Sequence, residues 1–551
     1  MKSKLLSTVA LSVVAATLVN STAAFAGGYT NPNNLPTATP IKHVVVIFGE
    51  NRSFDHYFAT YPKAANPAGE IPFVAKPKTP TVANLATAGL LTNNPNDTNT
   101  ANGTGATNPF RIDRTQVNTA GQNHSYTPEQ QADDNGNMDL FPKYTGHGTA
   151  GSVGAFGTNG MVMGYFDGNT VTAMWNYAQN FAMNYNNYTD TFGPSTPGAI
   201  AVISGQNNGA VNIVGTSSSI SDGQGGLTLI GDTDPAYDTC SSTTSTMMMT
   251  GKNIGDLLNA AEISWGGFMG GFDLTSTNIN NTTGCARSTY SSVLSAAKTD
   301  YVPHHNWFQY YKSTANPTHA RPSSIQAVGH TLQPNGETLD PANHEYDLND
   351  FYGAVLAGNY PAVSYIKMPA VQDGHPGNSD PLDEQEGDVQ LINFLQEQPD
   401  WNSTLVIITY DDSDGWYDHL YAKPTWASYD ATADQVNGPG QCGTGVATQV
   451  QPNGLNGKPV NGRCGPGTRV PFIVISPWAI PNYASSKRIT QSSVVRFIED
   501  NWLSGKRIGG GSLDATSGLI TDMLDFTQTP NNKLFLDPVA GTVAASVPMS
   551  Q

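Results

Sequence analysis

The stretch HVVVIFGEN, residues 43–51, decides the fold because it reads as a buried strand that ends in two polar side chains. A second stretch, LVIITYDD at 405–412, has the same form. Continuous runs of β-branched residues are typical of strands that are buried on both faces of a parallel sheet. In open α/β sheets, ligands bind just beyond the carboxyl ends of such strands. We therefore expect the polar residues at the two strand ends to lie together at one sheet edge.

The two polar pairs, Glu50-Asn51 and Asp411-Asp412, offer three carboxylates and one amide oxygen. Carboxylates gathered at one place repel each other unless a cation joins them, so the pairs indicate a metal site. An all-oxygen ligand set favours one hard divalent ion, such as Mg²⁺, Ca²⁺, Mn²⁺ or iron, over zinc. Each pair could instead cap a helix or fill a turn. The repetition of the pattern behind two separate strands favours the metal site.

The rest of the chain alternates further strands with helices, which predicts an α/β three-layer sandwich around a mostly parallel sheet. The expected strands are 262–268, 361–368 and 472–476, and the expected helices are 174–182, 253–261, 389–395 and 494–502. Three segments rich in Gly, Thr, Asn or Ser are expected as loop insertions in one domain that spans residues 27–551. These insertions lie near 76–120, 205–250 and 423–468.

Residues 1–26 have the pattern of a secretory signal peptide. Two lysines precede an apolar run from Leu5 to Val19, and small residues then lead to a cleavage site after Ala26. A membrane anchor is disfavoured because this run is short, and no later stretch is long enough to span a bilayer. We expect an exported protein, either secreted or periplasmic, with no integral membrane segment after cleavage.

The four cysteines suit an exported protein, in which disulfides form. They are Cys240, Cys285, Cys442 and Cys464, and they allow three pairings. Proximity in the sequence favours Cys240–Cys285 and Cys442–Cys464. A cysteine metal site is disfavoured because the close ligand spacing is missing.

The charge of the chain excludes one class of partner. Charged residues make up only 13% of the chain, and the formal net charge is −18. Nucleic acid requires basic patches, so we expect no nucleic-acid binding. The same charge gives no attraction to anionic lipid, although neutral lipid headgroups remain possible.

Ser195 is a candidate nucleophile. It lies in GPSTPG (193–198), which leads into the apolar run at 199–203, so the serine is expected at a helix N-terminus. Free N–H groups and the helix dipole at that position favour an alkoxide or a bound phosphate. The alternatives are a simple N-cap role for Ser195 and a nucleophile at Thr196.

Histidines in polar loops could complete such a site. His304, His305 and His375 lie in proline-containing loops, where a histidine can bind phosphate oxygens and protonate a leaving group. A single loop histidine is more often only solvated. His43 precedes the first strand and is expected to be structural.

Five motifs, taken in order, resemble those of the bacterial acid phosphatase/phospholipase C family within the alkaline phosphatase superfamily. The opening motif runs from IKHVVV to ENRSFDHYF (41–58), and TYDDSDGWYDH (409–419) is the last. Between them lie MGYF (163–166), FGPSTP (192–197) and DGHPG (373–377). The resemblance covers most of the mature chain and implies an alkaline phosphatase-like fold.

The resemblance also implies roles for individual residues. It implies a metal held by Glu50, Asn51, Asp411, Asp412 and the nucleophile, which falls on Ser195. It implies histidines around the phosphate, which fall on His124, His304, His305 and His375. His124 rests only on the short stretch NHS (123–125). His56, Asp418 and His419 are expected to support the site from outside it.

The expected function is that of a secreted, metal-dependent phosphoric ester hydrolase that forms a phosphoserine. Acid phosphatase activity on phosphomonoesters is favoured over phospholipase C activity on phosphatidylcholine-type lipids. The larger phosphocholine-specific phospholipases carry extra C-terminal β domains, whereas this sequence ends soon after 494–503. A non-catalytic exported binding protein is a second alternative. A sulfatase is disfavoured because no Cys or Ser lies in a Cys/Ser-x-Pro-x-Arg context.

Overall fold

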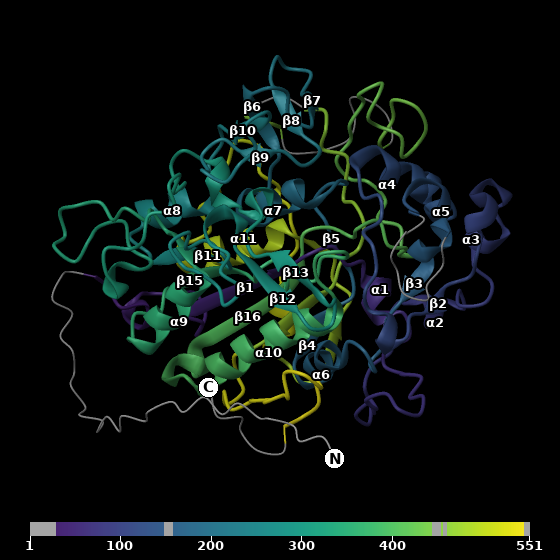
Figure 1. Cartoon of the computed structure of the whole chain (residues 1–551), viewed down its shortest axis with the longest axis horizontal. Coiled ribbons are helices and arrows are strands. Elements are labelled where there is room, and N and C mark those ends of the chain that lie inside the picture. The colour runs from purple at the N-terminus through teal and green to yellow at the C-terminus, as the bar shows by residue number, and fades with distance from the viewer. Residues whose placement is uncertain (1–28, 148–157, 444–452, 456–459, 545–551) are drawn as a thin grey trace.

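The apolar stretch at 43–49 forms the centre of a large sheet (Figure 1). The computed structural model describes residues 29–147, 158–443, 453–455 and 460–544, so the expected signal peptide lies outside the described residues. In the described chain the main sheet has eight strands. In spatial order they are β14 (Glu345–Asp347), β11 (Trp265–Met269), β15 (Val363–Lys367), β1 (His43–Gly49), β16 (Thr404–Tyr410), β17 (Phe472–Ile475), β4 (Ala182–Asn184) and β18 (Tyr483–Ser485).

The sheet is mostly parallel, as the sequence predicts. Strands β14, β11, β15, β1 and β16 all run in the same direction. Strand β17 is antiparallel to both of its neighbours, β16 and β4. The carboxyl ends of the five parallel strands therefore meet at one edge, where a ligand site is expected.

Helices cover both faces of this sheet and complete an α/β sandwich (Figure 1). One side carries α7 (Ser195–Ser204), α8 (Ile254–Ala260) and α11 (Ser492–Trp502), and the other carries α6 (Thr172–Asn180), α9 (Leu348–Leu356) and α10 (Pro381–Glu397). The buried core contains the strand residues together with the apolar faces of these helices. The expected helices at 174–182, 253–261 and 494–502 correspond to α6, α8 and α11.

Two elements differ from their expected bounds for local reasons. Helix α10 begins at Pro381, eight residues before the expected start, because Asp380 caps it through the N–H groups of the next turn. Strand β11 begins at Trp265 rather than at 262. Ile263 still donates its N–H to the carbonyl of Leu258, so residues 262–263 close helix α8 instead of extending the strand.

Smaller helices lie beside the main layers. They are α1 (Phe54–Phe58), α2 (Leu85–Ala88), α3 (Pro95–Thr98), α4 (Tyr126–Asp133) and α5 (Phe141–Tyr144). Three pairs of short strands accompany them: β2 (Phe110–Arg111) with β3 (Gly164–Tyr165), β5 (Asn187–Tyr188) with β19 (Ile489–Thr490), and β12 (Ser288–Ser291) with β13 (Ala296–Thr299).

The segment 205–250 is not the loop that its composition predicts. It folds into a second sheet at the top of the view in Figure 1, with strands in the order β7 (Ser219–Ser221), β8 (Leu227–Leu229), β6 (Asn208–Val214), β10 (Thr246–Met249) and β9 (Asp234–Pro235). Most of these strands are two to four residues long, too short to produce a recognisable apolar alternation. Strand β9 packs against the turn Pro303–His305 and so connects this sheet to the expected histidine loop.

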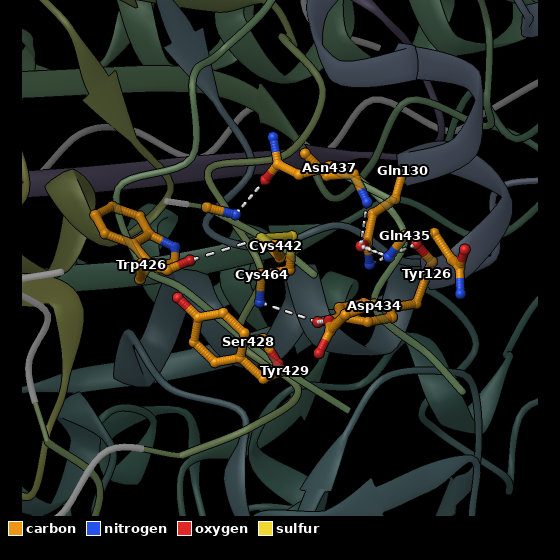
Figure 2. The surroundings of a disulfide bond; sticks show 12 residues. Tyr126, Gln130, Trp426, Ser428, Tyr429, Asp434, Gln435, Asn437, Cys442 and Cys464 are labelled. Atoms are coloured by element: carbon orange, nitrogen blue, oxygen red, sulfur yellow. Dashed lines mark hydrogen bonds between the residues drawn. A yellow bond between two sulfur atoms is a disulfide. The ribbon is translucent and has the colours of Figure 1, made fainter. Parts of the chain in front are cut away.

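Both favoured disulfides are present, Cys240–Cys285 and Cys442–Cys464. Figure 2 shows the second one beside Tyr126 of α4. The N–H of Cys464 donates to the Tyr126 hydroxyl, which donates in turn to Asp434. The carbonyl of Cys464 accepts from the N–H of Phe192. The disulfide thus fixes the described parts of the 423–468 insertion around Cys442 and Cys464 next to the segment that leads into Ser195.

Candidate active site

The two strand ends lie side by side, as the sequence predicts. Strands β1 and β16 pair in parallel up to Gly49 opposite Tyr410. Glu50 therefore follows β1 at the same level at which Asp411 follows β16. This register brings the two polar pairs together at the carboxyl edge of the sheet.

Backbone hydrogen bonds hold the two pairs in a fixed arrangement. The N–H groups of Asn51 and Asp412 both donate to Oδ1 of Asp411, at 2.9 and 2.8 Å. Asn51 adopts a positive φ of 62°, a conformation that Asn tolerates better than most residues. We call the side-chain oxygens of Glu50, Asn51, Asp411 and Asp412 the oxygen cluster. All four side chains belong to residues that are at most 1% exposed.

Ser195 faces this oxygen cluster. It is the first residue of α7, and its Oγ lies 2.9 Å from Oε2 of Glu50, 3.2 Å from Oδ2 of Asp412 and 3.4 Å from Oδ1 of Asn51. A hydroxyl has one proton and can donate to only one of these acceptors. Several oxygen acceptors around one hydroxyl are a suitable ligand set for a cation.

Close packing of α7 against the end of β16 fixes the position of Ser195. A Cβ at Gly198 would lie 2.1 Å from the carbonyl oxygen of Asp411. Gly198→Ala is therefore expected to displace either the helix or the strand end and to destabilise the protein by about 2 to 3 kcal/mol, with a loss of any activity that depends on Ser195. Chemical denaturation measures the stability.

The matched control is Gly387→Ala within α10, where the nearest atom to a new Cβ is the Met368 sulfur at 3.4 Å. This substitution is expected to be neutral or to stabilise by up to about 1 kcal/mol, because alanine has the higher helix propensity. Equal effects at the two glycines would contradict the close-contact explanation.

The oxygen cluster has the electrostatic character of a metal site. Burial, and next the charge of Glu50, raise the pKa of Asp411 to about 7. Burial, and next the charge of Asp411, raise the pKa of Asp412 well above its usual range. Oδ2 of Asp411 is buried and has no hydrogen-bond partner. An unpartnered buried carboxylate oxygen beside two other carboxylates fits a bound cation.

Lys367 is a buried cation at this edge that sequence reasoning missed. It is the last residue of β15, is 1% exposed, and forms an ion pair with Oε1 of Glu50. Burial opposes its charge, but Glu50 and neighbouring carboxylates outweigh that cost and raise the pKa of Lys367. The sequence contained one signal for this role of Lys367. The lysine lies at the end of the expected strand 361–368, and the carboxyl end of that strand belongs to the edge where ligands bind.

His304 and His305 lie on the turn Pro303–His305 beside the cluster. Nδ1 of His305 lies 3.2 Å from Oε1 of Glu50 and 3.4 Å from Oδ2 of Asp373. Nδ1 of His304 lies 3.5 Å from Asp234, and its side chain is 30% exposed. Burial and the charges of His304 and Lys367 lower the pKa of His305. The pKa of His304 is raised instead, because its hydrogen bond to Asp234 and nearby carboxylate charges outweigh burial.

His124 and His375 meet at Asp414, another residue that sequence reasoning did not single out. Nδ1 of His124 lies 3.2 Å from Oδ1 of Asp414, and ring nitrogens of both histidines lie within 4.8 Å of that carboxylate and of each other. Nε2 of His124 lies 3.4 Å from Nδ2 of Asn51. The ring centroids of His375 and His305 are 6.0 Å apart. His305 and His124 therefore contact residues of the oxygen cluster, and the rings of His304 and His375 lie beside that of His305.

Thr196 turns away from the cluster toward a different carboxylate. Its Oγ1 and its N–H both donate to Oδ1 of Asp232, at 2.9 and 3.0 Å. Of the two adjacent hydroxyls, Ser195 is the one that contacts the cluster oxygens. Asp232 was not expected in the site because it lies within the 205–250 insertion.

The outer residues of the motifs support the strand ends from outside. Nδ1 of His419 contacts Asp55 at 2.5 Å, and Arg469 pairs with both Asp55 and Asp418. The ring of His56 stacks on Trp416. His43 lies away from the cluster and packs against a neighbouring segment of the chain. Its Nδ1 is hydrogen-bonded to the carbonyl of Pro361, and its ring stacks on Tyr360.

Comparison with known proteins places the chain in a family. A model described as the Phosphoesterase family matches residues 41–503, which is most of the chain. The chain therefore belongs to the Phosphoesterase family. The membership supports an enzyme that hydrolyses phosphoric esters.

Relatives of known name match part of the chain. It is 30% identical over 190 residues to a non-hemolytic phospholipase C of Pseudomonas aeruginosa, a match that covers 33% of this chain and 25% of that protein. It is 27% identical over 187 residues to phospholipase C A of Mycobacterium tuberculosis, a match that covers 33% of each. The matches thus span a quarter to a third of the length of these relatives.

Proposed function

We propose that this member of the Phosphoesterase family hydrolyses phosphoric esters through nucleophilic attack by Ser195. One observation carries the proposal: the Ser195 hydroxyl lies within 3.4 Å of oxygens from Glu50, Asn51 and Asp412 at a helix N-terminus. The N-cap position of α7 is occupied by Pro194, so Ser195 is the first helical residue rather than an N-cap serine.

The proposed metal site consists of Glu50, Asn51, Asp411, Asp412 and Ser195. Its all-oxygen donor set and the unpartnered oxygen of Asp411 support one hard divalent ion, either Mg²⁺, Ca²⁺, Mn²⁺ or Fe²⁺. When bound, this ion supplies positive charge that favours ionisation of the serine and stabilises charge on a phosphoryl group.

The protein residues divide the reaction between them. Ser195 Oγ, after loss of its proton to water, forms a bond to phosphorus as the bond from phosphorus to the ester oxygen breaks. The departing oxygen keeps the bonding electrons and takes a proton from a histidine. We assign this proton to His304, which is partly exposed and pairs with Asp234. His124, His305 and His375 bind the phosphoryl oxygens. Water then hydrolyses the phosphoserine and regenerates the hydroxyl.

Two substrate classes are candidates. The sequence motifs resemble a family that contains both classes, and the first, favoured in the sequence analysis, is the phosphomonoesters of an acid phosphatase. The names of the relatives, which are phospholipases C, favour the second class, phosphatidylcholine-type lipids. We further propose an alkaline phosphatase-like fold and an exported protein. The two disulfides support export, because disulfides persist in oxidising compartments. No helix among the described residues has the length and apolarity to cross a membrane.

The test measures hydrolysis of p-nitrophenyl phosphate, p-nitrophenyl phosphorylcholine and phosphatidylcholine vesicles, before and after EDTA and after readdition of each metal. We expect activity that EDTA removes and one metal restores. A strong preference for the two choline substrates would assign phospholipase C. Absence of hydrolysis with every metal, together with thermal stability that chelation leaves unchanged, would contradict the proposal and favour a non-catalytic binding protein.

A further inference from the structure

The Asn51 side chain has to present one particular atom to the oxygen cluster. An amide carries an oxygen, which can bind a cation, and an NH₂ group, which cannot. Oδ1 of Asn51 lies 3.4 Å from Oγ of Ser195. Rotation of the amide by half a turn would place the nitrogen there instead. The role of Asn51 as a metal ligand therefore depends on the groups that bind its Nδ2.

Asp414 binds that nitrogen. Nδ2 of Asn51 donates to Oδ1 of Asp414 at 3.2 Å. The second carboxylate oxygen, Oδ2, accepts the backbone N–H of Gln122 at 2.9 Å. Both oxygens of Asp414 thus accept from N–H groups. A flipped amide would place the Asn51 oxygen against this carboxylate, where neither oxygen has a proton to share.

The turn that carries Asp414 is packed firmly in place. Asp414 is 0% exposed, and its backbone N–H donates to Oδ1 of Asp412 at 2.5 Å. That bond leaves Oδ2 of Asp412 to face Oγ of Ser195 at 3.2 Å. A Cβ at the next residue, Gly415, would lie only 2.6 Å from the carbonyl oxygen of Asn123. A carboxylate fixed in this way can determine the orientation of a neighbouring amide.

We propose that Asp414 is a positioning residue for the metal site, which orients the Asn51 amide so that its oxygen and not its nitrogen joins the ligand set. The inference rests on the proposed metal site, and Asp414 itself lies outside the proposed ligands. His124 contacts the same nitrogen of Asn51, but at 3.4 Å and through a ring nitrogen that accepts in only one tautomer. Asp414 is therefore the residue that selects the orientation.

Asp414→Asn is the first test. The new amide can still accept the N–H of Gln122, but it presents an NH₂ group to Asn51. Asn51 then turns its oxygen toward position 414 and its nitrogen toward the cluster. Calorimetry on metal-free protein measures the dissociation constant of Mg²⁺, Ca²⁺ or Mn²⁺, whichever the wild type binds most tightly. We expect this constant to rise by roughly 10- to 100-fold. An unchanged constant would overturn the inference.

Asp373→Asn controls for the loss of a carboxylate. Asp373 is a buried neighbour of the cluster that contacts His305 at 3.4 Å, and it makes no recorded hydrogen bond to the Asn51 amide among the described residues. This variant is expected to weaken metal binding much less than Asp414→Asn does. Equal losses in the two variants would show that Asp414 acts through its charge alone, which would overturn the positioning role.

The double variant Asn51→Asp/Asp414→Asn exchanges the two side chains and conserves their total charge. The new amide at position 414 donates to one oxygen of the new carboxylate at position 51, and the other oxygen faces the cluster. Both positions have a positive φ, 62° and 54°, which Asn and Asp alike tolerate. We expect the exchange to restore metal binding to near the wild-type level. A double variant that binds metal no better than Asp414→Asn would overturn the inference.

Metal affinity is the chosen measurement because Asp414 also contacts His124, at 3.2 Å, so turnover would report on both contacts. Failure of the proposed metal site is recognised separately. The wild type would then bind none of the three metals, which would overturn the site and the positioning role together. A wild type that binds metal, combined with an Asp414→Asn variant of the same affinity, would contradict only the role of Asp414.

Discussion

Ser195→Ala is expected to lower kcat by about 10⁴-fold or more, because no other hydroxyl among the described residues contacts the oxygen cluster. The fold is expected to persist, since the substitution removes one side-chain oxygen and the hydrogen bond it donates, which contributes about 1 kcal/mol. The measurements are steady-state kinetics on the preferred substrate and the melting temperature of the metal-loaded protein.

Thr196→Val is the matched control, because it removes a hydroxyl at the next position of the same helix. Thr196 contacts Asp232 and not the cluster, so this variant is expected to retain activity within about tenfold of the wild type. Acid quenching during turnover of a ³²P-labelled substrate should leave the label on the peptide that contains Ser195. If Ser195→Ala were fully active and Thr196→Val were inactive, the nucleophile would be Thr196 and not Ser195.

The sequence predicted the positions of the cluster residues well, for a physical reason. Strands β1 and β16 are buried on both faces, so their apolar runs are continuous and easy to recognise. Parallel strands place their carboxyl ends at one edge, which brings Glu50 and Asp411 together without further information. The positions of Ser195 and of the helix that begins there followed from the prolines around it.

The residues that sequence reasoning missed are those whose role depends on a tertiary partner. Lys367 ends a strand, and a lysine at that position is normally exposed. Only the contact with Glu50 explains its burial. Asp232 is 36 positions from Thr196 in the chain and lies between β8 and β9, in the segment that composition predicted as a loop. No local pattern could have brought these residues to the site.

Asp411→Asn is expected to remove the metal while leaving the backbone arrangement intact. Oδ1 of Asp411 accepts two backbone N–H groups, which an asparagine oxygen can still do, whereas its unpartnered Oδ2 becomes an amide nitrogen that cannot bind a cation. We expect metal content by elemental analysis to fall below about one-tenth of the wild-type value. Asp373→Asn is the matched control, because Asp373 is a buried neighbour that contacts His305 and lies outside the proposed ligand set. It is expected to retain its metal.

The same variant should reverse the order of stability when the metal is removed. At pH 8, Asp411 is ionised even with its pKa raised to about 7, so the metal-free wild type holds a buried negative charge beside Glu50 that Lys367 offsets only in part. Metal-free Asp411→Asn lacks that charge and is expected to be more stable by roughly 1 to 3 kcal/mol. Saturating metal stabilises only the wild type, by about 4.1 kcal/mol at a free concentration of 1,000 Kd, which exceeds this difference and restores the opposite order. Urea denaturation with and without chelator measures both. The wild type could instead be the more stable protein both with and without chelator. The negative charge of the cluster would then be balanced without the metal, and Asp411 would not be a metal ligand.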